Sequence, residues 1–167
     1  MKTRRHPNLA QLLMATREAA LRPFRPILQT YGLTGQQWRV MRALDDAPRG
    51  LSSAEIAQAC HILPPSLSQI LTGMESNGWV KRERSAVDLR KHTVTLTEAA
   101  QSLVYEIEPL INLQYDLIER KVGKALLRET VDAIERLRIA LESGVPGALD
   151  SQGAITAEKQ SRTQRRR

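Results

Sequence analysis

Apolar residues recur every three or four positions through most of the chain, and this spacing predicts amphipathic helices. The first such stretch runs from Leu9 to Gly32. Pro23 and Pro26 lie inside it, and each proline removes one helical hydrogen bond. We therefore expect a kink or a break in this first helix.

Three shorter helices follow, and residues typical of helix ends mark their limits. Thr34 with Gln37 and Ser52 with Glu55 each match the capping box, in which two side chains satisfy free backbone N–H groups. The third of these helices opens at Pro64, because proline is favoured in a first turn, where its missing N–H is not needed. An Asn-Gly pair indicates its end.

The periodicity changes after this helix. Residues 79–84 favour a strand, and residues 93–97 alternate β-branched and apolar side chains, as a returning strand does. A polar loop over 85–92 joins them, so we expect a β-hairpin. Two long amphipathic stretches, 98–122 and about 126–142, complete the pattern, with a glycine between them that we expect to break the helix.

This order of elements is that of a winged helix-turn-helix, whose second motif helix docks in the DNA major groove. The expected fold class is mainly α with a small β-hairpin wing (α+β). The flanking helices carry surplus apolar residues, which suggests a homodimer interface. The expected divisions are an N-terminal dimerisation helix over 7–32, a DNA-binding domain over 33–97 with a recognition helix at about 64–78 and a wing at about 79–97, C-terminal dimerisation helices over 98–143, and a basic tail over 144–167 that we expect to be disordered.

Composition narrows the class of protein. The chain has 167 residues, of which 41% are hydrophobic and 26% charged, as in an ordinary globular chain with one core. Its apolar runs are too short for a membrane span, and we expect no membrane partner. Cys60 is the single cysteine, so a disulfide within the chain is excluded and a reducing, cytoplasmic compartment is expected.

The net charge of +7 suggests an anionic partner, most often nucleic acid. The charge is concentrated at the ends, with +5 over residues 1–30 and +4 over 151–167. Residues 31–95 carry only +2, and residues 96–150 carry −4. Basic ends also occur simply as solvated tails, so charge alone leaves both interpretations open.

Short motifs add detail to this picture. They lie in Leu33–Val40, Pro65–Leu71 and Glu75–Val80, and in the hairpin, where Arg82 is followed after five residues by Asp88-Leu89-Arg90 and a strand ending in Leu-Thr. These motifs resemble those of the MarR family of transcription regulators. The chain departs from the family pattern at Ala100, where glycine is usual, but alanine suits a helix better than glycine.

The first helix is similar to one subgroup of that family. Residues 15–20 and 24–27 resemble repressors of homoprotocatechuate and related aromatic-acid catabolic operons, and the whole resemblance runs from about residue 9 to 142. It implies a homodimeric repressor of aromatic-compound catabolism that a small aromatic carboxylate releases from double-stranded DNA. Its operator would be a palindrome with half-sites about one helical turn, or roughly 10 bp, apart.

Polar residues in the first turns of the expected recognition helix lie off its apolar stripe. Hydroxyls and amides there suit phosphates and base edges, and glutamine pairs with adenine N6 and N7. The alternative is a capped, solvated helix face. These DNA-contact candidates are Ser66, Ser68, Gln69 and Thr72.

The wing supplies the remaining DNA candidates. Arg90 at the wing tip suits the narrow, electronegative minor groove. By the family resemblance Asp88 and Arg90 form the wing pair, and we expect Asp88 to pair with Arg82 or Arg84 and hold the hairpin in shape. Further phosphate candidates, each equally well explained as a solvated charge, are Lys81, Arg84 and Lys91.

Arg17 is the candidate anchor for the effector. On a helical wheel it falls among apolar residues, where a guanidinium needs a partner. That partner is either a carboxylate of this chain or its dimer mate, or a bidentate carboxylate ligand. Trp38 and Arg39 are candidates to line the same cleft, although a tryptophan is more often simply part of the core.

Other classes of site receive less support. Cys60 is expected to be a buried structural thiol, with an oxidant-sensing repressor as the alternative. His6, His61 and His92 are too scattered for a metal motif, and we expect neither a metal nor a cofactor. Residues arranged for catalysis are not apparent, so we expect no enzyme. A non-specific structural nucleic-acid-binding protein remains the rival from another class.

Overall fold

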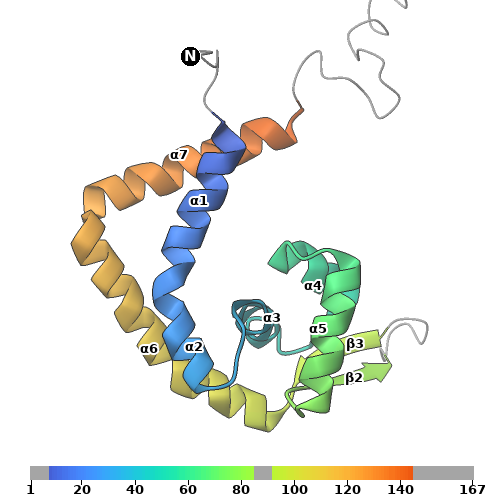
Figure 1. Ribbon diagram of the computed structural model, residues 1–167. Helices are drawn as coiled ribbons and strands as arrows, with labels where there is room; N and C mark the ends of the chain where they lie inside the picture. The colour runs from blue at the N-terminus through green and yellow to red at the C-terminus, as the bar shows by residue number, and fades with distance from the viewer. Residues whose placement is uncertain (1–7, 85–91, 145–167) are drawn as a thin grey trace, which may run out of the picture. The chain divides into compact units, whose positions relative to one another are not determined.

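The computed structural model describes residues 8–84 and 92–144, with side chains over 8–83 and 93–144. These residues form a mainly helical chain with a small antiparallel sheet (Figure 1). Its elements are α1 (Leu9–Leu21), the 3-10 helix η1 (Arg22–Phe24), α2 (Arg25–Thr30), α3 (Gly35–Asp45), β1 (Leu51–Ser52), α4 (Ser53–Cys60), α5 (Pro64–Ser76), β2 (Val80–Arg84), β3 (His92–Leu96), α6 (Glu98–Val122) and α7 (Lys124–Glu142).

The predicted break in the first helix is confirmed. The α-helical hydrogen bonding of α1 stops at Leu21, a single 3-10 turn follows, and α2 begins at Arg25. Pro23 and Pro26 occupy the first turns of η1 and α2. Each proline therefore lies in a first turn, where its missing N–H would have no partner within its own helix.

Both predicted capping boxes are also present. The backbone N–H of Thr34 donates to Gln37 Oε1 at 2.8 Å, and the N–H of Gln37 donates to Thr34 Oγ1 at 3.2 Å. Ser52 and Glu55 exchange the same pair of bonds, at 2.7 Å and 3.3 Å. Local sequence therefore sets where α3 and α4 begin.

The sheet has three strands rather than the two that the hairpin predicted. β3 lies between β1 and β2, with Leu51 opposite Val94 and Arg82 opposite Val94 on the other side. β1 is only two residues long, and Gly50 before it has a φ of +79°. A strand of two residues is too short to show an alternating pattern in the sequence. It is a strand only because it pairs with β3.

One core supports the helix-turn-helix and the sheet. Helices α3, α4 and α5 gather beside the hairpin of β2 and β3 (Figure 1). They bury aliphatic side chains against the sheet and the first half of α6. The largest fully buried side chains are Met41, Ile56, Leu67, Leu71, Met74, Ile107, Val40, Val94, Val104 and Cys60. The predicted winged helix-turn-helix architecture is confirmed.

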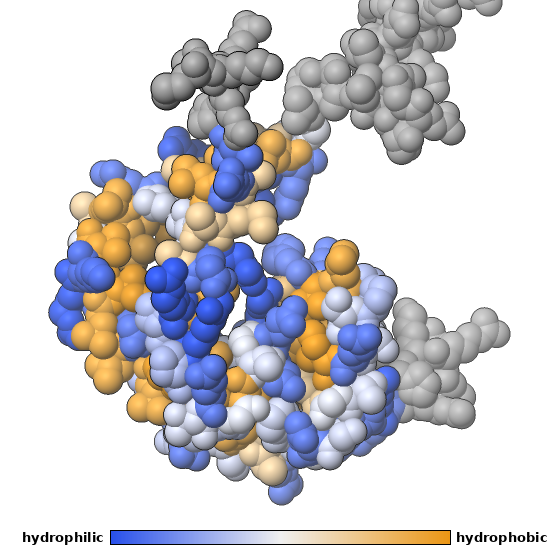
Figure 2. All heavy atoms as spheres, viewed as in Figure 1, coloured by the Kyte–Doolittle hydropathy of each residue, from blue (hydrophilic) through white to orange (hydrophobic). Residues whose placement is uncertain are grey.

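The chain divides into two units, residues 1–116 and 117–167, so the boundary lies within α6. α1, in the first unit, and α7, in the second, have no buried residues. α7 begins directly after Gly123, the predicted helix breaker, whose φ is +91°. Large apolar side chains stay exposed along the second half of α6, which is orange in Figure 2. Among the described helices, none combines the length and apolarity needed to cross a membrane.

Candidate functional site

Helix α5 has one buried and one exposed face. Leu67, Leu71 and Met74 are buried and hold it against the core. All four DNA-contact candidates on α5 are exposed, as the sequence predicted. Because its first two residues are prolines, the start of α5 offers fewer free N–H groups than an ordinary helix N-terminus. Recognition by this helix therefore depends on its side chains.

Hydrogen bonds within α5 divide these polar side chains into two kinds. Thr72 Oγ1 donates to the Ser68 carbonyl at 2.9 Å, and Ser76 Oγ donates to the Thr72 carbonyl at 3.0 Å. Those two hydroxyl protons are held inside the helix. Ser66 and Gln69 have no hydrogen-bond partner among the described residues, so their polar groups are free to meet a partner molecule.

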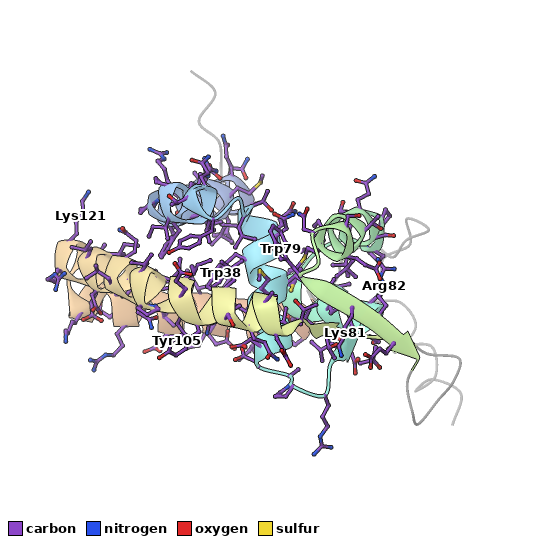
Figure 3. The ribbon with its side chains drawn as sticks, turned by 90° about the horizontal axis from the view of Figure 1, so that it is seen from below. Trp38, Trp79, Lys81, Arg82, Tyr105 and Lys121 are labelled. Carbon is purple, nitrogen blue, oxygen red and sulfur yellow. The ribbon has the colours of Figure 1, made fainter. Side chains whose placement is uncertain are left out.

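The side chain of Arg82 extends from β2 toward α5 (Figure 3). Its Nε is 3.2 Å from Glu75 Oε2 on α5, which ties the hairpin to the recognition helix. It also lines a cavity of about 270 Å³ between α4 and α5, together with Ser53 and Ser68. The sequence predicts that Asp88 pairs with Arg82 or Arg84. Asp88 lies outside the described residues, and the carboxylate that the structure places on Arg82 is that of Glu75.

Lys81 lies on the opposite face of β2, because side chains alternate along a strand. Its Nζ pairs with Glu83 Oε1 at 2.9 Å. Both line an open groove of about 780 Å³ formed with the end of α3 and the start of α6. The structure therefore does not bring Lys81 together with the polar face of α5.

The remaining wing candidates lie at the end of β2 and after it in the sequence. The backbone of β2 ends at Arg84 and that of β3 begins at His92. The side chain of Arg84 and the whole of Asp88, Arg90 and Lys91 lie outside the described residues. Their roles stay predictions, carried by a hairpin whose two strands pair antiparallel, with Val80 opposite Leu96.

A second polar group lies between α3 and α6 and was missed in the sequence. The Arg42 guanidinium lies 6.0 Å from the centroid of the Trp38 ring, and its Nη1 is 2.9 Å from Glu108 Oε1. Arg42 Nε is buried without a hydrogen-bond partner in the described structure. Figure 3 shows the Trp38 ring on the side of α3 that faces α6. The available signal was spacing, since residues four apart share one face of a helix.

Arg39 joins α3 to the end of α4. Its Nη1 donates to the Cys60 carbonyl at 2.8 Å, and Cys60 Sγ contacts the Arg39 carbonyl at 3.6 Å. The bond satisfies a helix-terminal carbonyl just before His61, which adopts the left-handed conformation with φ of +48°. Arg39 thus has a structural contact that its assignment as an effector-lining residue did not anticipate.

Cys60 is fully buried. Burial raises the pKa of its thiol, because a thiolate loses its hydration there, and the nearby Arg39 charge lowers it by less. The thiol therefore stays protonated near neutral pH, whereas reactive cysteines have a lowered pKa and access to solvent.

The helical wheel predicts Arg17 among apolar residues, and its side chain is exposed in the described chain. α1 buries none of its own residues, so its apolar face has no cover within the described chain. No carboxylate of the described residues pairs with Arg17. Its charge is therefore available to a partner or a ligand.

A metal centre finds no support in the part of the chain that the structure describes. No group of three or more histidine, cysteine, aspartate or glutamate side chains comes together there. Of the three histidines, His61 is exposed at the end of α4, His6 is outside the described residues, and the side chain of His92 is not described.

Comparison with known sequences places this arrangement among transcription regulators. Residues 31–91 match the profile described as the MarR family. Over 146 residues the chain is 35% identical to the homoprotocatechuate degradative operon repressor of Escherichia coli, which covers 85% of this chain and 97% of the repressor.

Two solved structures have the same fold, and each contains a bound partner molecule. NadR in complex with 4-hydroxyphenylacetate is 34% identical with a TM-score of 0.70, covering 82% of this chain and 97% of NadR. CouR, a transcriptional repressor bound to a 23-mer DNA duplex, is 25% identical with a TM-score of 0.66, covering 80% of this chain and 92% of CouR.

Proposed function

Because this chain belongs to the MarR family of transcription regulators, we propose that it is a homodimeric repressor that a small aromatic carboxylate releases from a palindromic operator. It would control genes of aromatic-compound catabolism and act in the cytoplasm, where its DNA target lies. The exposed polar face of α5 beside the hairpin is the observation that carries the proposal. This surface suits the major groove, and the known structure of CouR on DNA supports the same use of the fold.

The homodimer is proposed because the described chain leaves a large apolar surface uncovered. α1 and α7 bury nothing in the described chain, and both carry large exposed apolar side chains. Apolar patches of this kind mark interaction surfaces, and a second copy offers an identical surface related by a two-fold axis. Two copies of α5 would then meet half-sites about one helical turn apart, roughly 10 bp, on a palindrome.

The effector is proposed to bind beside α3. Trp38 offers an aromatic face, and the Arg42 guanidinium lies 6.0 Å from the centroid of its ring. A guanidinium binds a carboxylate through two parallel hydrogen bonds, and an aromatic ring packs well against tryptophan. Arg17 remains a proposed second anchor, since it is exposed and unpaired in the described chain. The complex of NadR with 4-hydroxyphenylacetate supports an effector of this class.

Release from DNA requires that the ligand bind one dimer geometry better than the other. We propose that the ligand-bound dimer holds its two α5 helices at a spacing that no longer matches successive major grooves. Arg39 connects α3 to the end of α4, so a shift of α3 would reach the helix-turn-helix through this bond.

The proposal is tested with the full-length chain and DNA from its own promoter region. Fluorescence anisotropy should show saturable binding that unlabelled random DNA does not displace. Adding 4-hydroxyphenylacetate should lower the affinity, whereas the neutral amide of the same compound should not. Sedimentation should show a dimer with and without DNA. Sequence-independent, steeply salt-dependent binding would instead favour a coating protein, and loss of binding in peroxide would favour an oxidant sensor.

A further inference from the structure

The helix-turn-helix of this chain lacks basic residues. Residues 50–80, which span α4, the turn and α5, contain no lysine and no arginine. The one histidine of this stretch, His61, ends α4 and does not lie on α5. The exposed residues on α5 are neutral apart from Glu75, which pairs with Arg82. These neutral residues are Pro64, Pro65, Ser66, Ser68, Gln69, Thr72, Ser76.

This composition limits which bases α5 can read. Guanine is most often recognised by arginine or lysine, which donate to O6 and N7, and cytosine by a carboxylate that accepts from N4. α5 offers no cation, and its one carboxylate is held 3.2 Å from the Arg82 guanidinium. The strong contacts to G·C pairs are therefore missing from this helix.

The groups that α5 does present match A·T pairs. Gln69 is exposed, free of partners in the described structure, and carries the only carboxamide of this helix. A carboxamide makes two hydrogen bonds to adenine N6 and N7. The hydroxyl of Thr72 already donates within the helix, so the threonine offers its methyl group to the groove.

Apolar groups surround the start of the same helix. Leu63 is 75% exposed in the turn before α5, and the ring of Pro65 is exposed in the first turn. An exposed leucine at this point is not explained by the core. Apolar side chains in the major groove contact the C5-methyl group of thymine.

We propose that α5 selects A·T base pairs, with Gln69 pairing to an adenine and the apolar groups of Leu63, Pro65 and Thr72 lying against thymine methyls. The proposal rests on the proposed function, because it requires α5 to enter the major groove. It adds to that function the base preference of each half-site and the residue that sets it.

The test begins with selection from a pool of duplexes that carry a random central segment, using the full-length chain. The enriched half-sites should contain A·T pairs at the positions that α5 covers. Gln69→Ala should weaken binding to the selected duplex by about 5- to 100-fold. Repeating the selection with Gln69→Arg should change one symmetry-related A·T pair in each half-site to G·C. Gln36→Ala, which removes an exposed glutamine from α3, is the matched control and should change nothing.

A second measurement removes only methyl groups from the DNA. Replacing the selected thymines of one half-site by deoxyuridine keeps base pairing and should lower affinity about fourfold per buried methyl. The same replacement in flanking DNA should have no effect. Half-sites that require G·C pairs and are insensitive to Gln69→Ala would overturn this proposal while leaving the repressor function intact. Failure to enrich any sequence would overturn both.

Discussion

Arg42 Nη1 lies 2.9 Å from Glu108 Oε1, so an ion pair joins α3 to α6 directly beside the Trp38 ring. Both side chains remain more than a third exposed, and an exposed pair contributes at most about 1 kcal/mol to stability. Its position matters more than its strength, because it holds the guanidinium over an aromatic surface with Nε left unpaired.

Arg42→Ala should therefore remove the response to the effector while leaving DNA binding intact. We expect the concentration of 4-hydroxyphenylacetate needed to release DNA to rise at least about tenfold, because the proposed contact between the guanidinium and the ligand carboxylate would be lost. Anisotropy titration of the effector against the preformed complex measures this. Arg49→Ala, which removes an exposed arginine from the turn after α3, should keep the normal response. An unchanged response in Arg42→Ala would contradict the role.

Arg17→Ala should have a similar functional effect for a different structural reason. Its guanidinium is exposed and unpaired in the described chain, so its removal should change the unfolding free energy by less than about 0.5 kcal/mol. DNA affinity should stay normal and the effector response should be lost. Arg22→Ala, an exposed arginine in η1, is the control. If both variants respond normally, the carboxylate anchor lies elsewhere.

Much of the fold could be predicted from local signals. The capping hydroxyls of Thr34 and Ser52, the prolines of the first helix and the alternation in β3 each act within a few residues, so the sequence alone locates them. β1 could not be predicted, since its two residues are ordered by pairing with β3 and not by any pattern of their own.

The candidate site was predictable only in part. The exposed face of α5 follows from helical periodicity. The exposure of Arg17 does not, because a helical wheel identifies an apolar face but not whether the same chain covers it. Arg42 was missed because its importance comes from its pairing with Glu108, which lies 66 residues away in the sequence.

Gly50→Ala should destabilise the winged helix. Gly50 has a φ of +79°, and a Cβ there would lie 2.7 Å from both Thr95 Cγ2 and the Val94 carbonyl oxygen. Backbone strain and overpacking together should lower the unfolding free energy by about 2 to 4 kcal/mol. Urea unfolding measures the change. The control is Gly73→Ala in α5, where a Cβ meets nothing within 4 Å and alanine should raise stability by up to about 1 kcal/mol. Equal stabilities for the two variants would refute the explanation.

Stability should fall at alkaline pH partly because of Cys60. Burial raises the pKa of its thiol in the folded state, so the folded chain keeps a proton that the unfolded chain loses. The contribution is complete below the unfolded thiol pKa of about 8.5 and declines as pH rises above it. Urea unfolding at pH 7.5 and pH 9.5 should show a smaller decline for Cys60→Ala than for the native chain. The same decline in both would show that the thiol is not responsible.

Arg90→Ala should weaken operator binding at least about tenfold, because an arginine at the wing tip suits the narrow, electronegative minor groove. The best control is Lys81→Ala, which also removes one positive charge from the hairpin region. Lys81 pairs with Glu83 on the face of β2 away from α5, so we expect at most about a threefold loss. Anisotropy at one fixed salt concentration compares the two, because phosphate contacts are salt-dependent. Circular dichroism and sedimentation should show the same fold and assembly in both variants. Equal losses would mean that the hairpin contributes general positive charge and not a specific groove contact.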